Sequence, residues 1–136
     1  MENVNITVGG LTLIVNGDLT QGGGYMDSLY VEQALTLNVN GSIELNSLDN
    51  SFSTLNVISV GDVYIEGGNF GDLSLQNVST NGGEFNLVFS GNINVEGTIS
   101  TLGGELNIEA RSYDSEGLVR TDVNILSTAT IQTGVA

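Results

Sequence analysis

The sequence predicts an all-β protein that folds as a parallel β-helix, or β-solenoid, of about six or seven coils. Three observations support this fold class. Apolar and small polar residues alternate along most of the chain, one motif recurs at a spacing of 21 residues, and 19 glycines but no prolines separate the alternating runs. Alternation indicates strands, and a repeat of this length indicates coils that stack on one another. We expect residues 1–136 to form a single domain.

Short alternating runs are the expected strands. They are Leu11–Val15, Leu35–Val39, Leu55–Val57, Val63–Ile65, Leu73–Leu75, Phe85–Phe89, Ile93–Val95, Leu106–Ile108 and Val123–Ile125. A period of two over runs this short, bounded by Gly and Asn, is typical of strands. Asn or Gly interrupts every window that is long enough for a helix, so we expect no helix.

The repeats give the length of a coil. Residues 80–87 and 101–108 both read Thr-x-Gly-Gly-Glu-apolar-Asn-apolar. A second motif, Gly-polar-apolar, begins at Gly17, Gly41, Gly61 and Gly91. The unit is therefore a strand, a Gly corner, a second strand and a variable polar loop, in about 20 to 24 residues. An antiparallel β-sandwich also has short alternating strands, but it does not explain the repeat.

Stacked coils place equivalent apolar side chains above one another inside the helix, because no coil can bury its apolar face alone. We expect one such core ladder, and its members are Leu13, Leu37, Val57, Leu75, Leu87, Ile108 and Ile125. The outward positions between them are mostly Asn, Ser and Thr, whose side chains can hydrogen-bond along the stack and to water.

The charge and the missing residue types exclude several classes of function. The chain has 16 Asp and Glu against 2 Arg, a net charge of −14, and no His or Cys. Without His or Cys there is no Ser-His-Asp or Cys-His nucleophile and no disulfide. A strongly anionic chain does not bind nucleic acid or an anionic membrane through its charge. No apolar run approaches the roughly 18 residues of a membrane span, and no leader is visible, so we expect a cytoplasmic protein or an interior piece of an exported one.

Two stretches resemble a known family. Residues 35–67 begin Leu-Thr-Leu-Asn-Val-Asn-Gly-Ser-Ile-Glu-Leu-Asn-Ser, continue through Asp49-Asn50, Leu55-Asn-Val57 and Gly61-Asp-Val63, and are similar to repeats of filamentous-haemagglutinin-like exoproteins. So are residues 90–100 (Ser-Gly-Asn-Ile-Asn-Val-Glu-Gly-Thr-Ile-Ser), which Gly103-Gly104 follow, and the resemblance covers roughly residues 30–110. This resemblance implies a right-handed β-helix shaft on the bacterial surface, exported by two-partner secretion and used in adhesion and biofilm formation. It therefore implies an extracellular or cell-surface location. Bactofilin-type filaments are also small β-helices that polymerise end to end, so a cytoplasmic filament stays open.

Paired carboxylates are the catalytic groups that the sequence offers. Asp62 with Glu66, or Glu84 with Glu105 one coil apart, could supply the acid and base of a glycosidase. The sequence shows no aromatic platform that would hold a sugar beside them. We therefore expect solvated carboxylates, no catalytic residues and no enzyme.

Calcium is the one cofactor that the composition allows, because oxygen ligands are plentiful and the negative charge is uncompensated. Asp27 and Asp72 are the weak candidates, since each follows glycines in a motif that approaches Gly-Gly-x-Gly-x-Asp. Neither motif is complete. We expect glycine corners with a carboxylate that caps a turn, and no bound cofactor.

The two ends of the helix are the expected functional surface. A β-helix ends in open strand edges, which proteins usually cap. The residues expected at these edges are Val4, Ile6 and Val8 at the start and Thr128, Thr130 and Ile131 near the end. No Pro or Lys blocks either edge, and open edges favour head-to-tail stacking into a filament.

We therefore expect a non-enzymatic structural protein whose partner is another copy of itself, with an anionic exterior that keeps filaments apart laterally. The alternative is an adhesin segment that binds a glycan or a host surface through loops 22–27 and 111–122. The second loop is irregular and holds both cations, Arg111 and Arg120. Tyr64, at an outward strand position, is a further candidate for such a contact.

Overall fold

The fold is all-β. A computed structural model describes residues 4–6, 9–22, 28–68, 72–111 and 122–134, and these residues form strands but no helix. Consequently, no described helix is long and apolar enough to cross a membrane. The strands are β1 (Val4–Ile6), β2 (Leu11–Val15), β3 (Leu19–Thr20), β4 (Leu29–Val31), β5 (Ala34–Val39), β6 (Ile43–Asn46), β7 (Thr54–Ser59), β8 (Val63–Gly68), β9 (Leu73–Ser79), β10 (Phe85–Ser90), β11 (Ile93–Val95), β12 (Thr98–Ser100), β13 (Leu106–Arg111), β14 (Val123–Ile125) and β15 (Thr130–Gln132).

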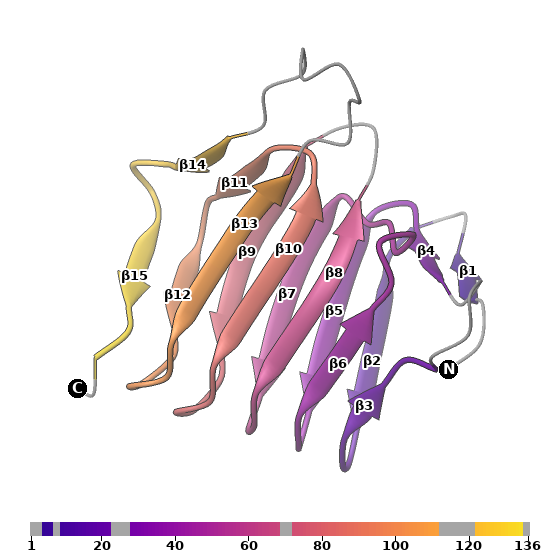
Figure 1. The fold of residues 1–136 in the computed structure, drawn as a ribbon, viewed down its shortest axis with the longest axis horizontal. Helices are drawn as coiled ribbons and strands as arrows, with labels where there is room; N and C mark the ends of the chain where they lie inside the picture. The colour runs from indigo at the N-terminus through magenta and orange to yellow at the C-terminus, as the bar shows by residue number, and fades with distance from the viewer. Residues whose placement is uncertain (1–3, 7–8, 23–27, 69–71, 112–121, 135–136) are drawn as a thin grey trace.

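The strands wind into a β-helix with two main sheets (Figure 1). The eight-stranded sheet has the order β14-β11-β9-β7-β5-β2, with β12 paired to β9 and β15 paired to β12. The five-stranded sheet has the order β13-β10-β8-β6-β3, and β1 pairs with β4 in a separate two-stranded sheet. Every described strand pair is parallel.

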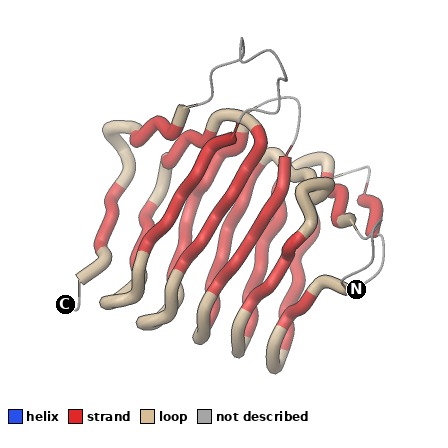
Figure 2. Tube along the Cα trace, in the orientation of Figure 1, coloured by secondary structure: helices blue, strands red, loops and turns tan. Residues whose placement is uncertain are grey.

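The winding is right-handed, as the family resemblance implied. In Figure 1 the near strands β6, β8 and β10 run upward and the far strands β5, β7 and β9 run downward, while the chain advances from right to left. Figure 2 shows the tan corners that join each far strand to the next near strand along the lower edge. The predicted parallel β-helix is therefore confirmed.

The expected number of coils is wrong. The five-stranded sheet passes once through each coil, so its strands mark about four complete turns. Its register gives coils of 24, 20, 22 and 21 residues, through the pairs Leu19↔Ile43, Ile43↔Val63, Val63↔Phe85 and Phe85↔Leu106. The coil length lies within the expected range, but the described residues before β3 and after β13 complete no further coil. β1 pairs outside the main sheets, and β14 and β15 have no described return strand.

The core consists of several ladders rather than one. Leu13, Leu37 and Val57 are in register in the eight-stranded sheet. Leu75 belongs to the neighbouring ladder, opposite Leu55, because the register shifts between Leu55 and Val57. Such a shift is what an extra residue, a β-bulge, produces.

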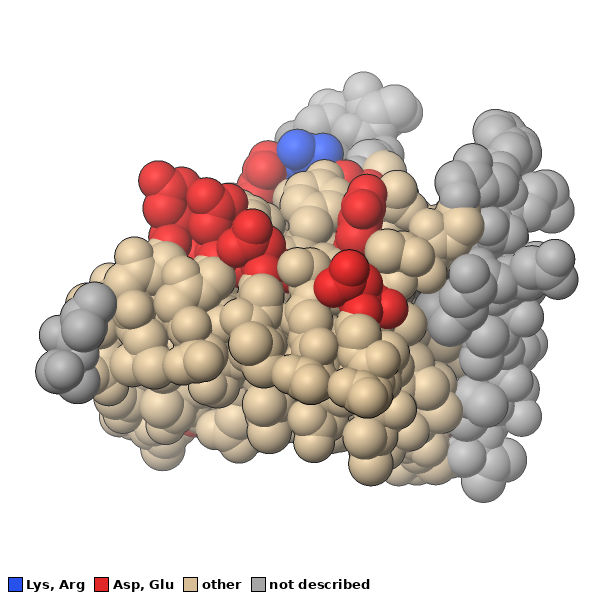
Figure 3. Space-filling view, turned by 90° about the horizontal axis from the view of Figure 1, so that it is seen from below, with Lys and Arg blue, Asp and Glu red and all other residues tan. Residues whose placement is uncertain are grey.

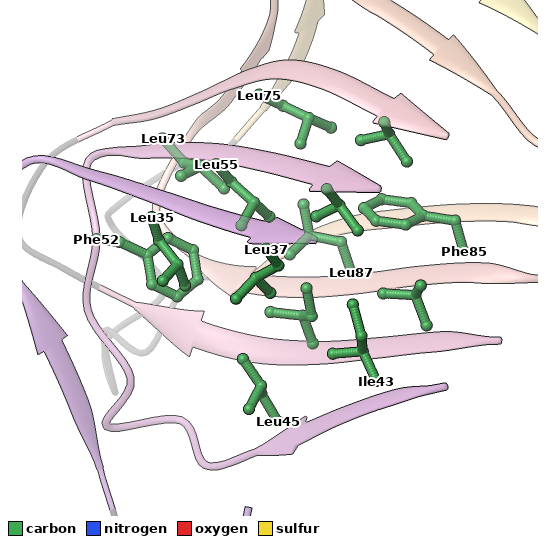
Figure 4. Packing of buried hydrophobic residues seen from close by; sticks show 14 of the residues in the cluster. Leu35, Leu37, Ile43, Leu45, Phe52, Leu55, Leu73, Leu75, Phe85 and Leu87 are labelled. Carbon is green, nitrogen blue, oxygen red and sulfur yellow. The ribbon is translucent and has the colours of Figure 1, made fainter. Parts of the chain in front are cut away.

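The other predicted ladder members lie elsewhere. Leu87 and Ile108 pair in the five-stranded sheet, so they line the opposite wall of the core. Figure 4 shows side chains from both walls meeting in the narrow interior. Leu37, Val57, Leu75 and Leu87 are buried, and Leu13 and Ile108 are half-buried because they lie in the first and last strands of their sheets. Ile125 is exposed, since no described coil covers it.

The recurring Thr-x-Gly-Gly-Glu motif forms the corner between the two sheets. Thr80 Oγ1 donates to the carbonyl of Gly83, and Thr101 Oγ1 donates in the same way to Gly104 at 2.7 Å. The corners stack so closely that a Cβ on Gly104 would lie 2.1 Å from the carbonyl oxygen of Gly83. Two residues of each corner have positive φ, which glycine adopts readily at Gly82 and Gly103. The repeat in the sequence is therefore a repeat of corner geometry.

Candidate functional site

The C-terminal end of the helix exposes side chains that are buried one coil earlier. Ile125 pairs in register with Val95, and Ile131 pairs with Ile99. Ile125 is 62% exposed and Ile131 is 39% exposed, whereas Val95 and Ile99 are both fully buried. Equivalent ladder positions are therefore buried in one coil and exposed in the next, because no described strand covers Ile125 and Ile131.

The N-terminal end shows the same change to a smaller degree. Leu11, Leu13 and Val15 of β2 are half-buried, and their register partners in β5, residues 35, 37 and 39, are buried. Within the described part of the chain, β2 and β3 each pair with one strand only. Each end of the helix therefore presents open strand edges around a partly exposed apolar interior.

The structure places the predicted end residues unequally. Thr130 and Ile131 lie in β15, and Thr128 donates through Oγ1 to the carbonyl of Glu96 at 3.0 Å, so these three do lie at the C-terminal end. Val4 and Ile6 lie in β1, which pairs with β4 and not with the main sheets, so they do not form the expected edge there. Val8 lies outside the described residues.

Some end residues were missed by sequence reasoning. Leu11, Val15, Val123 and Leu126 also belong to the exposed or half-exposed apolar set. The signal that could have found them is their position in the first and last alternating runs, because the outermost coils of any stack have one uncovered side.

A groove of about 690 Å³ lies at the edge of the coils opposite the tight corners, near the separate β1–β4 sheet. Its described lining is Tyr30, Val31, Glu32, Leu48, Asp49, Ser51, Phe52, Ser53, Gly68 and Ser90. Tyr30 and Leu48 are partly exposed, and Phe52 is buried against Phe89 with ring centroids 5.8 Å apart. The groove therefore combines an accessible aromatic ring, two carboxylates and several hydroxyl groups.

A buried amide pair anchors this region. Asn50 and Gln21 exchange two side-chain hydrogen bonds of 2.8 and 2.9 Å. Asn50 also accepts from the backbone N–H of Leu29 and donates to the carbonyl of Glu66. Asn50 is fully buried, and its four hydrogen bonds join the segment that contains β4 to the later coil that contains β8. Sequence reasoning did not single out this residue, because its environment exists only after the coils stack.

The predicted carboxylate pairs lie on the surface. Asp62, Glu84 and Glu105 are exposed and Glu66 is half-buried. Asp62 Oδ1 accepts from the backbone N–H of Glu84 at 3.0 Å, so it caps the corner of the neighbouring coil. This hydrogen bond gives Asp62 a structural role, because it holds the corner of the neighbouring coil.

Tyr64 and Glu66 form a polar pair on the outer face of β8, where Tyr64 donates its hydroxyl proton to Glu66. This hydrogen bond, with a smaller effect of burial, raises the pKa of Tyr64 to about 12. On β13, Arg111 bonds Glu109 at 2.9 Å and lowers the pKa of that carboxyl.

The calcium candidates are not assembled into a site by the described residues. Asp72 Oδ1 accepts from Asn92 Nδ2 at 3.0 Å, and Asp27 lies outside the described residues. No three described Asp or Glu residues gather closely enough to hold a metal ion. Of the two predicted loops, residues 23–27 and 112–121 also lie outside the described residues.

Comparison with known proteins gives one finding. Residues 1–59 match a family model described as repeats of unknown function (DUF5649). This stretch ends with β7 and covers less than half of the chain, so the chain is similar to these repeats over its first coils. No curated protein and no solved structure gives a significant match.

Proposed function

We propose that this chain is a non-enzymatic structural module whose copies join end to end through their open coils. The observation that carries the proposal is the change from buried to exposed at equivalent ladder positions, from Val95 to Ile125 and from Ile99 to Ile131. A coil of a second copy placed over these positions would bury them as the interior coils are buried.

Backbone geometry supports the same contact. At one end the outer edges of β14 and of residues 106–109 of β13, and at the other end those of β2 and β3, carry peptide groups that no described strand pairs. All strand pairs inside the helix are parallel, so a head-to-tail copy would continue both sheets without reversal. Such a contact joins two different surfaces and does not close, so it builds a fibre. Burying a Leu, Ile or Val side chain fully stabilises the contact by about 1.5 to 3 kcal/mol.

Electron microscopy together with sedimentation of the purified chain tests the proposal. We expect fibres that grow by end-to-end joining of chains, in a concentration-dependent equilibrium with shorter species. Ile131→Asp places a charge on the last strand and should shift the population to monomers. Val60→Asp is the matched control, because Val60 is exposed as well, at 52% against 39% for Ile131, but lies in a mid-shaft corner. Dispersed monomers of the parent chain at every concentration would rule out end-to-end assembly.

A cell-surface fibre is the setting that we propose for this module. The support is the resemblance of residues 35–47 and 90–100 to filamentous-haemagglutinin-like repeats, together with the right-handed β-helix. Labelling of intact cells of the native host with an antibody to the chain tests the location. Signal that appears only after cell lysis would favour a cytoplasmic filament instead.

The groove favours a second candidate function, the binding of a glycan by an adhesin segment. Tyr30 is partly exposed and could stack on a sugar ring, while Glu32 and Asp49 could accept hydrogen bonds from its hydroxyl groups. A glycan array should then give a signal that Tyr30→Ala removes and that Tyr64→Ala, which lies on β8 and does not line the groove, preserves. No array signal from the parent chain would count against this candidate.

A further inference from the structure

The outer face of the eight-stranded sheet differs from the rest of the surface in its charge. Its outward positions on β2, β5, β7, β9 and β11 alternate with the buried ones. The described residues at these positions are Thr12, Ile14, Thr36, Asn38, Thr54, Asn56, Ile58, Ser74, Gln76, Asn77, Ser79 and Asn94. None of them is charged. One carboxylate, that of Glu96 directly after β11, does reach this face, where it accepts hydrogen bonds from Ser74 Oγ at 2.8 Å and Gln76 Nε2 at 2.6 Å.

The other described acidic residues lie elsewhere. The outward positions of the five-stranded sheet include Glu44, Glu66 and Glu109. Others occupy corners and connections, among them Asp18, Asp62, Asp72, Glu84 and Glu105. Figure 3 shows the red side chains gathered over one part of the surface, with broad areas that carry none. The described carboxylates are therefore unevenly distributed over the surface.

This uncharged face also carries exposed isoleucines. Ile14 is 80% exposed and Ile58 is 55% exposed, and both are in register with Asn38 on the strand between them. These two isoleucines, one on either side of Asn38, give the face apolar area whose burial would be favourable.

We propose that this face, defined by the twelve residues named above, is the lateral contact between two copies of the chain lying side by side in a fibre. The inference rests on the proposed end-to-end assembly. Two copies that each carry a charge of −14 repel each other when their acidic faces meet. At physiological ionic strength charges are screened beyond about 8 Å, so a close contact is feasible only through a surface that sets few charges opposite one another. The uncharged face meets this condition, and its isoleucines provide apolar area.

The size of the face explains why lateral contact would follow fibre formation. Five strands about 4.8 Å apart, with about five residues each at about 3.3 Å per residue, span roughly 400 Å². Two such faces bury about 800 Å², which is less than the roughly 1,200 Å² of a stable interface. A single pair of chains therefore stays apart. In a fibre, contacts along the shaft act together, and their combined affinity far exceeds that of one pair.

Electron microscopy of matched double variants tests the inference. Ile14→Glu with Ile58→Glu adds two charges to the uncharged face, and both side chains point to solvent, so folding should be preserved, as circular dichroism would verify. Asn46→Glu with Asn107→Glu adds the same charge to the five-stranded sheet and is the control. We expect paired fibres from the parent chain and the control, and single fibres from the isoleucine variant.

The outcomes separate the two proposals. Parent fibres that are all single, or isoleucine-variant fibres that still pair, would overturn the lateral contact while leaving end-to-end assembly in place. Single parent fibres that bind an insoluble neutral polysaccharide, with binding lost in the isoleucine variant, would assign the face to a glycan and overturn the self-contact. Parent chains that form no fibres would overturn both proposals.

Discussion

Asn50 shows how a single polar residue can hold an irregular segment against a regular stack. Its amide is fully buried and makes four hydrogen bonds, to Gln21, Leu29 and Glu66. We predict that Asn50→Ala lowers the free energy of unfolding by about 3 kcal/mol, because leaving each buried polar partner unsatisfied costs about 1 to 3 kcal/mol. Urea unfolding measures this change. Asn38→Ala, on an exposed outward position, is the control and should change stability by less than about 0.5 kcal/mol.

Asn50→Asp sharpens this prediction. Aspartate keeps the shape of asparagine but accepts hydrogen bonds only, so the donations to Gln21 and Glu66 are lost and a charge is buried. We expect this variant to be at least as unstable as Asn50→Ala at neutral pH. Stability equal to that of the parent chain would show that the amide pair does not anchor the groove.

Tyr64 gives a prediction about pH. Its hydrogen bond to Glu66 raises its pKa from the ordinary tyrosine value of 10.0 to about 12. A raised pKa means that the folded state holds the proton more tightly, so the stability that Tyr64 adds is present below about pH 10 and is lost between about pH 10 and 12. The effect is small because the side chain is 37% exposed. Absorbance of tyrosinate should show a late-titrating component from Tyr64, and Glu66→Gln should move that component to lower pH. An unchanged titration curve in that variant would contradict the pairing.

Within a strand, the direction of a side chain determines whether a charge introduced there destabilises the fold. Leu37 and Asn38 are neighbours on β5, but Leu37 is buried in the core and Asn38 faces solvent. We predict that Leu37→Asp abolishes cooperative unfolding, because an unpaired carboxylate in the ladder is strongly unfavourable. Asn38→Asp adds the same charge on the same strand and should fold normally. Thermal melts followed by circular dichroism compare the two, and a cooperative melt of Leu37→Asp would argue against the ladder.

The elements also show how far the sequence could be interpreted. Alternation predicted inward residues such as Leu37 and Leu87 correctly, because a strand in a β-helix has one face toward solvent and one face toward the core. It could not predict that Leu75 aligns with Leu55 rather than Val57, since a bulge shifts the register without changing the local pattern. It also could not predict that Ile125 is exposed, because Ile125 would be buried only under a further coil, which no described residue forms.

The candidate sites were harder to predict than the fold. The groove combines Tyr30 with Phe52 and Ser90, which lie in three different coils, so only the stacked structure places them together. The C-terminal edge was predictable from the order of strands, whereas the N-terminal edge was not. β1 has the same alternating pattern as the other strands, and nothing in that pattern indicates that it pairs with β4 instead of β2.

At the scale of the whole molecule, net charge sets the conditions for assembly. Each copy carries −14, so every contact between copies, axial or lateral, works against long-range repulsion. Raising the ionic strength from about 0.01 M to about 0.15 M shortens the screening length from about 30 Å to about 8 Å. We predict that the concentration needed for fibre formation falls over this range, as sedimentation would measure.

The same titration distinguishes screening from specific metal binding. If screening alone acts, calcium and magnesium salts at equal ionic strength should promote assembly equally. If Asp27 or Asp72 ligates calcium, calcium should promote assembly at concentrations where magnesium has little effect, because calcium accepts more oxygen ligands in a looser geometry. Asp72→Asn would then remove the difference. Fibres that are most abundant at the lowest ionic strength would contradict the electrostatic argument, since repulsion between anionic copies can only be weakened by salt.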